Sequence, residues 1–347
     1  MTREQFDIAI VGASFAGLSC AATAARSGCN VCVLDAKSSA GVRPHTTGIL
    51  VREAADVVEV PDKLVRKIAG VRLYAPDLNY IDLEAPGYHF LATDLPALLN
   101  WYAGRAERAG AQLRFARRFT GAVQTNTHVD LHQHRVRASY LVGADGARSS
   151  VAGCFDLGRN RRFLIGLEHA YAGIEGVDPD RLHVFIDGQL APGYIAWVVP
   201  GVNDTQVGLA GTHPGKLDID GFVNKIRMLF DLRHATRLGR RGGLIPVGGR
   251  VHPTSKGRVL LLGDAAGTVS PLTAGGIHKA LEIGDAAGRA FGDATGRALG
   301  DARATARDPI REIERMLPRY VWKGLLRRAA AITPPDALVN TMLGSNI

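Results

Sequence analysis

Cysteine, long apolar runs and acidic charge are all scarce in this chain of 347 residues. The four cysteines are too few and too irregularly spaced for a disulfide scaffold, which is typical of a reducing compartment. No uninterrupted apolar run approaches the roughly 18 residues that cross a bilayer, and charged Arg3 and Glu4 precede the first apolar stretch. We therefore expect neither a membrane anchor nor a signal peptide, and a cytoplasmic location.

Charge and apolar content place the chain among folded proteins with a basic surface. Apolar residues make up 46% of it, and 42 lysines and arginines against 33 acidic residues leave a formal charge of +9. At roughly 150 residues per domain, the length predicts about two domains, or one large α/β unit with an insertion. The basic residues form scattered pairs without interleaved aromatic residues, which argues against a nucleic-acid partner and leaves phosphate-bearing ligands open.

The first forty residues predict a strand, a turn, a helix and a second strand. Residues 6–12 (FDIAIVG) and 29–35 (CNVCVLD) are strand-like, and small residues rich in alanine lie between them. At the turn, Gly12 permits a tight bend, the small Ser14 lets the backbone approach a pyrophosphate, and Gly17 lets the helix pack on the sheet. Asp35 ends the second strand, where an acid accepts hydrogen bonds from an adenosine ribose. The segment therefore predicts a dinucleotide-binding unit.

Cys29 and Cys32 form a C-x-x-C pair within this segment. Both fall on the predicted second strand, where successive side chains alternate between faces. We expect buried packing there, not redox or zinc chemistry.

Two later segments repeat the pattern of a strand followed by a glycine-containing loop. Residues 139–151 (SYLVGADGARSSV) contain Asp145 and Gly146, and residues 259–287 contain Gly263 and Asp264 before a proline and glycine loop and a helix. The N–H groups of residues 275–277 open that helix, so we expect them to be unpaired and able to stabilise a negative charge.

The three segments together, in this order and spacing, resemble the flavoprotein family that includes the aromatic hydroxylases and the geranylgeranyl reductases. The resemblance implies FAD as cofactor, held in a discontinuous Rossmann-like α/β fold. It also implies a set of cofactor-binding residues, namely Gly12, Ser14, Phe15, Ala16, Gly17, Asp35, Ala36, Arg43, Asp145, Gly146, Gly263, Asp264, Pro271, Gly275, Gly276 and Ile277.

Within that family the chain is most similar to the geranylgeranyl reductases. Residues 271–278 (PLTAGGIH) resemble their PLTGGGIH loop, and residues 193–200 (GYIAWVVP) resemble their GGYAWxFP strand. Three departures stand out. The reductases carry a cysteine where this chain has His45 or Thr46, a family arginine position holds Leu95, and the part after residue 308 is shorter than their helical domain.

The resemblance implies that hydride leaves the N5 atom of reduced flavin while an acid supplies a proton. We assign His45 and Thr46 as candidate catalytic residues, because an imidazole donates protons near neutral pH; a surface or capping role for His45 stays open. Tyr194 and Trp197, which we place on one strand, are candidate substrate-binding residues, with plain core packing as the alternative.

His128, His132 and His134 suggest a metal cluster, but their segment is typical of a hairpin that leads into the strand before Asp145. We predict no metal site there.

The predicted organisation has three parts. An FAD-binding domain spans residues 1–161 and 250–307, an inserted antiparallel sheet over residues 162–249 binds substrate, and residues 308–347 form a helical tail. The tail has an apolar stripe that suits core packing, and basic residues that suit a membrane surface (Arg319, Lys323, Arg327 and Arg328).

Three functions remain open from the sequence. The first is reduction of carbon–carbon double bonds in an isoprenoid or other hydrophobic substrate. The second is a monooxygenase that uses NAD(P)H and O₂ to form a flavin hydroperoxide and acts on an aromatic or natural-product substrate, and the third is a non-catalytic FAD-binding protein. The expected substrate is a hydrophobic small molecule or lipid, and the expected electron donor is NAD(P)H or a ferredoxin. We expect no nucleic-acid partner. Peripheral membrane contact is an alternative to a purely cytoplasmic location.

Overall fold

The computed structural model describes residues 3–57, 59–271, 273–295 and 308–319. The chain divides into two compact units. Unit 1 takes its described residues from 1–43, 96–162 and 246–321, and unit 2 takes them from 44–95 and 163–245. The chain thus leaves unit 1 and returns to it twice. The predicted domain boundaries placed residues 44–95 with residues 1–43, whereas here they pack with residues 163–245.

Unit 1 is built on a mainly parallel sheet. Its central strand β1 (Glu4–Val11) pairs in parallel with β2 and β11, and these pair in parallel with β8 and β18. The bounds of the other strands are β2 (Val31–Leu34), β8 (Gln112–Arg114), β9 (Val123–Gln124), β10 (Val129–Leu131), β11 (Val136–Gly143), β17 (Ser255–Lys256) and β18 (Val259–Leu261). Ile8 and Ile10 of β1 are completely buried, because layers cover both faces of a parallel sheet.

The two strands predicted in the first forty residues are confirmed as β1 and β2. Cys29 and Cys32 are both buried, as predicted, although Cys29 lies just before β2 and only Cys32 lies on it. Burial raises the pKa of the Cys32 thiol to about 11, so this sulfur stays protonated at neutral pH.

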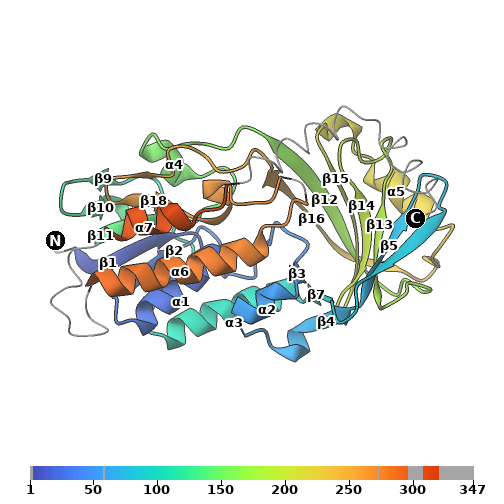
Figure 1. Cartoon of the computed structure of the whole chain (residues 1–347), viewed down its shortest axis with the longest axis horizontal. Coiled ribbons are helices and arrows are strands. Elements are labelled where there is room, and N and C mark those ends of the chain that lie inside the picture. The colour runs from blue at the N-terminus through green and yellow to red at the C-terminus, as the bar shows by residue number, and fades with distance from the viewer. Residues whose placement is uncertain (1–2, 58, 272, 296–307, 320–347) are drawn as a thin grey trace. The chain divides into compact units, whose positions relative to one another are not determined.

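Two helices of unit 1 lie side by side at the sheet, α1 (Phe15–Arg26) and α6 (Ile277–Thr295) (Figure 1). Glycines on α6 allow the backbones to approach closely. A Cβ atom on Gly284 would lie 2.5 Å from the Ala16 carbonyl oxygen, and one on Gly288 would lie 2.7 Å from Thr23 Cβ. The hydroxyl of Ser19 donates to the Leu281 carbonyl across this contact at 2.9 Å.

The remaining helices of unit 1 are α3 (Leu95–Arg108), α4 (Ser150–Cys154), α7 (Pro309–Met316) and the 3-10 turns η2 (His132–His134) and η4 (Gly263–Ala266). The tail was predicted to be helical, and α7 is its described part, with Ile310 and Ile313 buried. Lys323, Arg327 and Arg328 lie outside the described residues. Within the described residues, no helix combines the length and apolar character that crossing a membrane requires.

Unit 2 contains a seven-stranded sheet in the order β16-β12-β15-β14-β13-β5-β6. The bounds are β5 (Gly70–Tyr74), β6 (Tyr80–Glu84), β12 (Phe163–Ala172), β13 (Arg181–Phe185), β14 (Ala196–Pro200), β15 (Thr205–Gly211) and β16 (Thr236–Pro246). The antiparallel pairs β12/β15, β15/β14 and β14/β13 come from the predicted segment. The sequence did not predict that β5 pairs in parallel with β13, since paired residues of the two strands lie 111 positions apart in the chain.

Each face of this sheet has its own apolar cluster. On one face α5 (Ile219–Ile226) buries Phe222 and Ile226 against Val207 and Leu209. On the other face, Leu182 and Val199 pack with residues of a three-stranded sheet, which consists of β3 (Ile49–Val51), β7 (Phe90–Thr93) and β4 (Val65–Ile68). The short helices α2 (Glu53–Val57), η1 (Asp62–Leu64) and η3 (Pro214–Lys216) complete the unit.

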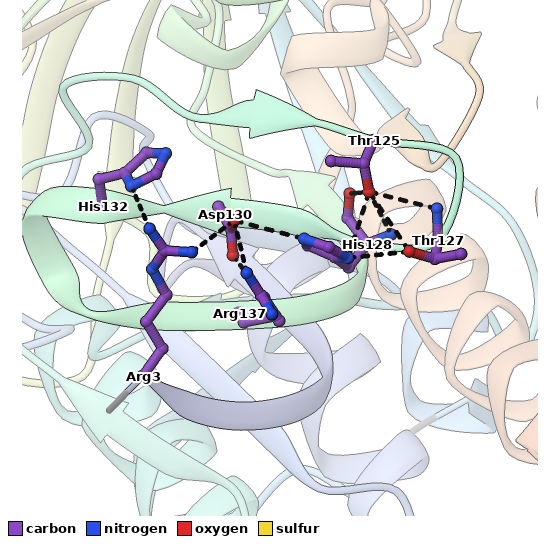
Figure 2. Close-up of polar contacts among 7 residues, drawn as sticks. All are labelled: Arg3, Thr125, Thr127, His128, Asp130, His132 and Arg137. Atoms are coloured by element: carbon purple, nitrogen blue, oxygen red, sulfur yellow. Dashed lines mark hydrogen bonds and ion pairs between the residues drawn. The ribbon is translucent and has the colours of Figure 1, made fainter. Parts of the chain in front are cut away.

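A charged cluster in unit 1 ties the N-terminal segment to the hairpin of β10 and β11 (Figure 2). Asp130 lies at its centre and accepts hydrogen bonds from Arg3 at 2.7 Å and from Arg137 at 2.7 Å and 3.0 Å. His128 lies 3.3 Å from the same carboxylate. The Arg137 hydrogen bonds lower the pKa of Asp130 to about 2, against the opposing effect of burial.

Replacing Asp130 by Asn should destabilise the protein by about 1–2 kcal/mol at pH 7, because charge-assisted hydrogen bonds to two arginines are lost. A carboxyl whose pKa is depressed in the folded state stabilises that state above its unfolded pKa. The difference between D130N and the parent protein should therefore shrink as the pH falls from about 4 towards 2. Urea unfolding across this range measures it, with Glu107→Gln on the exposed face of α3 as the control; an equal difference at pH 7 and pH 3 would contradict the assignment.

Candidate functional site

The first turn of unit 1 exists because two residues lack a side chain. Gly12 has φ +109°, and a Cβ atom on it would lie 2.2 Å from the carbonyl oxygen of Ala144. A Cβ atom on Gly17 would lie 2.0 Å from the carbonyl oxygen of Gly12. Both positions therefore require glycine, as the sequence predicted for a turn that meets a phosphate.

The N-terminus of α1 follows this turn. Ser14 is the N-cap residue, is exposed and makes no capping hydrogen bond, and the first turn of α1 contains no acidic residue. The N–H groups of Phe15, Ala16 and Gly17 lack partners within the helix by construction. They leave a positive helix end that suits an anion such as a pyrophosphate.

Asp35 lies at the end of β2 and is buried. One carboxylate oxygen accepts from the backbone N–H of Ala13 at 2.7 Å, and the other accepts from the N–H of Lys37 at 2.8 Å. Asp35 therefore fixes the first turn in addition to its predicted contact with the ribose. Ala36 and Arg43 are both exposed, and Arg43 has φ +46°.

Asp145 has a role in the fold that the sequence did not reveal. Its carboxylate accepts hydrogen bonds from the Ser149 hydroxyl at 2.6 Å and from the backbone N–H groups of Ser150 and Val151, at the start of α4. Burial nevertheless raises its pKa. Gly146 follows with φ +84°, so the turn requires a residue that tolerates a left-handed backbone. The contact of Asp145 and Gly146 with the cofactor stays a prediction.

The third segment lies against the first. A Cβ atom on Gly263 would lie 2.9 Å from Ala16 Cβ, and one on Gly276 would lie 3.6 Å from Asp264 Oδ1. Although Asp264 keeps some exposed surface, its carboxyl group is surrounded by protein, and burial raises its pKa to about 6. The first turn, the Asp264 turn and the start of α6 therefore meet within unit 1.

The loop before α6 differs in one detail from the prediction. The helix begins at Ile277, after the buried Pro271, and the N–H of Gly275 contacts the Thr273 hydroxyl at 3.4 Å, so it is not unpaired. A Thr side chain can reach back to the backbone in this way near a helix start.

Asn160 is a site residue that sequence reasoning missed. Its side-chain amide donates to the carbonyl oxygens of Ala147 at 3.1 Å and Asp264 at 2.8 Å. Asn160 thus joins the loop of the second segment to the turn of the third. A single asparagine within RNRR carries no sequence signal for that role, because one of the two residues that it joins, Asp264, lies 104 positions further along the chain.

These observations test whether unit 1 fits FAD. The two glycines let the first turn pack tightly on the backbone around it, and Ser14 is the exposed residue between them. The start of α1 suits a pyrophosphate, and the carboxyl groups of Asp35 and Asp264 suit hydroxyl donors. The residues fit the cofactor, and they would hold it by backbone N–H groups and two carboxyl groups.

In unit 2, His45 and Thr46 are both exposed. His45 Nδ1 lies 3.2 Å from the carbonyl oxygen of Gly242. A carbonyl only accepts hydrogen bonds, so Nδ1 carries a proton and donates it. Nε2 is then the ring nitrogen that this contact leaves without a proton of its own in the neutral ring.

Of the two candidate substrate-binding residues, Trp197 lies on a strand as predicted and Tyr194 does not. Trp197 is on β14 and partly buried, and its indole Nε1 donates to Glu168 Oε2 at 2.9 Å. Tyr194 is not on the strand, so its predicted placement is wrong. It lies in a turn that Gly193 forms with φ +80°, and β14 begins only at Ala196.

The histidines near the hairpin of unit 1 have separate partners. His128 contacts Asp130, His132 Nδ1 accepts from Arg3 at 2.7 Å, and His134 Nε2 donates to the Arg118 carbonyl (Figure 2 shows the first two). Across the described part of the chain, no group of three His, Cys, Asp or Glu residues could hold a metal ion.

Comparisons with known proteins bear on this site. Residues 5–165 match the FAD binding domain family. A digeranylgeranylglycerophospholipid reductase of Methanopyrus kandleri is 31% identical over 309 residues, which cover 82% of this chain and 80% of that protein. The chain belongs to the geranylgeranyl reductase family. The predicted family resemblance is confirmed, and the protein is an FAD-dependent enzyme.

Solved structures share the fold. A geranylgeranyl bacteriochlorophyll reductase-like protein of Thermoplasma acidophilum superposes with a TM-score of 0.83 at 19% identity, over 96% of this chain and 90% of that one. A flavin-dependent brominase superposes with a TM-score of 0.73 at 16% identity, over 98% and 90%. The predicted α/β FAD-binding fold is therefore confirmed.

Replacing Asn160 by Leu should weaken FAD binding by roughly tenfold, because the two turns that it joins lose a shared donor. Quenching of FAD fluorescence on titration of the apoprotein measures the dissociation constant. Asn126→Leu, on the loop between β9 and β10, is the matched control. Unchanged affinity in N160L would show that the two turns hold their places without Asn160.

Replacing Asp264 by Asn should stabilise the apoprotein at pH 7.5 and weaken FAD binding. Burial raises the pKa of Asp264, so the folded state loses stability as the pH rises from about 4 through about 6, by an amount on the order of 2–3 kcal/mol. The gain in D264N should therefore vanish below pH 4. Thermal unfolding of apoprotein at pH 4 and pH 7.5 measures it, and a gain that is equal at both pH values would rule out the buried charge as its cause.

Proposed function

We propose that this protein reduces carbon–carbon double bonds of an isoprenoid or other hydrophobic substrate, with FAD as the hydride carrier. The observation that supports this most is the similarity to the Methanopyrus kandleri reductase, which extends over four fifths of both chains. It includes the segment with Trp197 and the loop before α6, in addition to the FAD-binding segments that related flavoproteins share.

The described residues suit the separate demands of such a reaction. In unit 1, the start of α1 and the carboxyl groups of Asp35 and Asp264 bind and orient the cofactor. When bound and reduced, FAD supplies hydride to one carbon of the double bond. The other carbon then needs a proton.

His45 is our candidate for the proton donor. Its Nδ1–H is held by the Gly242 carbonyl, so the ring keeps one orientation and presents Nε2. A proton carried on Nε2 can pass to the substrate and leave a neutral ring that is protonated on Nδ1. Thr46, its exposed neighbour, is our candidate for orienting the substrate at this point.

The substrate would be hydrophobic because unit 2 offers an indole and apolar neighbours. Trp197 packs, together with Val184 and Phe90, on a buried cluster that includes Leu182 and Val199, and only its Nε1 is polar. Tyr194 lies in the turn just before this strand. We propose both residues as contacts for an apolar chain.

The test is an anaerobic single-turnover experiment on the holoprotein, reduced with dithionite so that no biological electron donor is needed. Mixing with a digeranylgeranylglycerophospholipid should restore the absorbance of oxidised flavin and add two hydrogens per double bond to the lipid, measured by mass spectrometry. A reoxidation that requires O₂, with ¹⁸O appearing in the product, would replace the reductase by a monooxygenase. Bound flavin with neither reaction would indicate a non-catalytic protein.

The same assay examines His45. Replacing it by Ala should slow anaerobic reoxidation by roughly a hundredfold, because general acid catalysis contributes about that much. FAD affinity should stay unchanged, since the change lies outside unit 1. Turnover equal to that of the parent protein would remove His45 from the reaction.

A further inference from the structure

Three neighbouring strands of unit 2 bring Glu168, Gly208 and Trp197 into one row. In the register of the sheet, Glu168 on β12 lies opposite Gly208 on β15, and Gly208 lies opposite Trp197 on β14 (Figure 1 shows the three strands together). Residues opposite one another in a sheet point to the same face. The carboxylate and the indole therefore share a face, with a glycine between them.

Gly208 lets the two side chains meet across the middle strand. A Cβ atom on this residue would lie 2.6 Å from atoms of the Trp197 indole. The indole thus lies over the backbone of β15, where any larger residue would displace it. Across that gap, Trp197 Nε1 donates to Glu168 Oε2 at 2.9 Å.

Arg241 holds the other carboxylate oxygen. It lies on β16, the strand on the far side of β12, and its guanidinium donates to Glu168 Oε1. Its Nη2 also donates to the carbonyl oxygen of Thr47 at 3.4 Å. One carboxylate is therefore linked to Trp197 on one side and, through Arg241, to the segment of residues 45–47 on the other.

Residues 241–243 of β16 hold that segment at two further points. His45 Nδ1 donates to the Gly242 carbonyl at 3.2 Å, and a Cβ atom on Gly243 would lie 2.7 Å from the His45 carbonyl oxygen. The backbones are in close contact there. A change in the position of Arg241 would be transmitted directly to His45 and Thr47.

Stability alone does not account for this arrangement. The Glu168 side chain is only 5% exposed, and the indole that it binds packs on apolar residues of two sheets. The desolvation free energy of burying a carboxylate and a guanidinium offsets much of their electrostatic attraction. Proteins in which such a pair is replaced by apolar residues are therefore often equally stable. What the ion pair adds is a defined geometry at both of its ends.

We propose that Glu168 is a positioning residue for the substrate, which sets the orientation of Trp197 directly and that of the His45–Thr47 segment through Arg241. The proposal rests on the proposed function, because that function assigns Trp197 and His45 to the substrate. Neither Glu168 nor Arg241 touches the reacting atoms in this proposal.

The decisive variant removes both charges at once. E168L/R241M replaces the buried ion pair by apolar side chains of similar size, so the protein should fold with a urea midpoint close to that of the parent. Holoenzyme of this variant should show a KM for the digeranylgeranylglycerophospholipid about tenfold higher, which reflects lost positioning. E168Q keeps an oxygen that accepts from Trp197 and should recover part of this loss.

A second readout follows Trp197 without any turnover. Labelling the holoenzyme with 5-fluorotryptophan gives one ¹⁹F resonance for each of the three tryptophans, and W197F identifies that of Trp197. E168L/R241M should move this resonance and leave the other two in place. Asp187→Asn is the matched control, because Asp187 is an equally buried carboxylate of unit 2 that pairs with Lys225 and contacts neither Trp197 nor Arg241. D187N should leave both KM and the resonance unchanged.

The outcomes separate the two proposals. A parent-like KM and an unmoved Trp197 resonance in E168L/R241M would overturn the positioning role. If the parent holoenzyme reduces no double bond, the proposed function fails, and the ¹⁹F resonance alone then decides whether Glu168 orients Trp197. If KM rose in D187N to the same degree as in E168L/R241M, general destabilisation would explain the rise, and this result would also overturn the proposal.

Discussion

The backbone contact between α1 and α6 is the constraint on which the cofactor-binding unit depends. Gly284, Gly288 and Gly292 recur every fourth residue, so they form one stripe along α6, and a Cβ atom on any of them would collide with α1 or with Ser27 just beyond it. The stripe lets the start of α6 reach the start of α1 although some 260 residues separate them. Because our proposed cofactor site uses both helix starts, the glycines would shape that site by setting the distance between the two helices.

Each unit contains a buried carboxylate, and the two are accommodated in opposite ways. Asp264 has no cationic partner among the groups that shift its pKa, so burial favours the protonated form up to about pH 6. Glu168 has Arg241 on one oxygen and an indole N–H on the other. The Asp264 carboxyl group can therefore accept a hydrogen bond from a ligand hydroxyl, whereas both oxygens of Glu168 already accept hydrogen bonds from the protein. That difference is why we assign a ligand to Asp264 and a positioning role to Glu168.

The parts of the molecule that the sequence predicted are those governed by local rules. Gly12, Gly17 and Asp35 are recognisable because one strand–turn–helix unit imposes them within thirty residues. Asn160 and the Glu168–Arg241 pair could not be predicted, since their partners lie 104 and 73 residues away and no periodicity records such contacts. The same limit applies to β5, whose parallel pairing with β13 joins residues 44–95 to unit 2. Tyr194 was misplaced for a local reason, because Gly193 adopts a left-handed backbone and delays the strand.

The geranylgeranyl reductases that this chain resembles carry a cysteine at the position of His45 or Thr46, and a histidine there differs from a cysteine in how it holds a proton. A thiol with an ordinary pKa near 8.5 holds its proton at neutral pH, whereas an imidazole exchanges one readily there. A hydrogen bond to one nitrogen decides which nitrogen faces a substrate, since a freely rotating imidazole presents either atom. Here the Gly242 carbonyl fixes Nδ1, and Arg241, the next residue along β16, is fixed by Glu168. In our proposal the orientation of the proton donor therefore depends on a carboxylate two strands away from Trp197, so that one side chain supports both proposed roles, substrate binding and proton transfer.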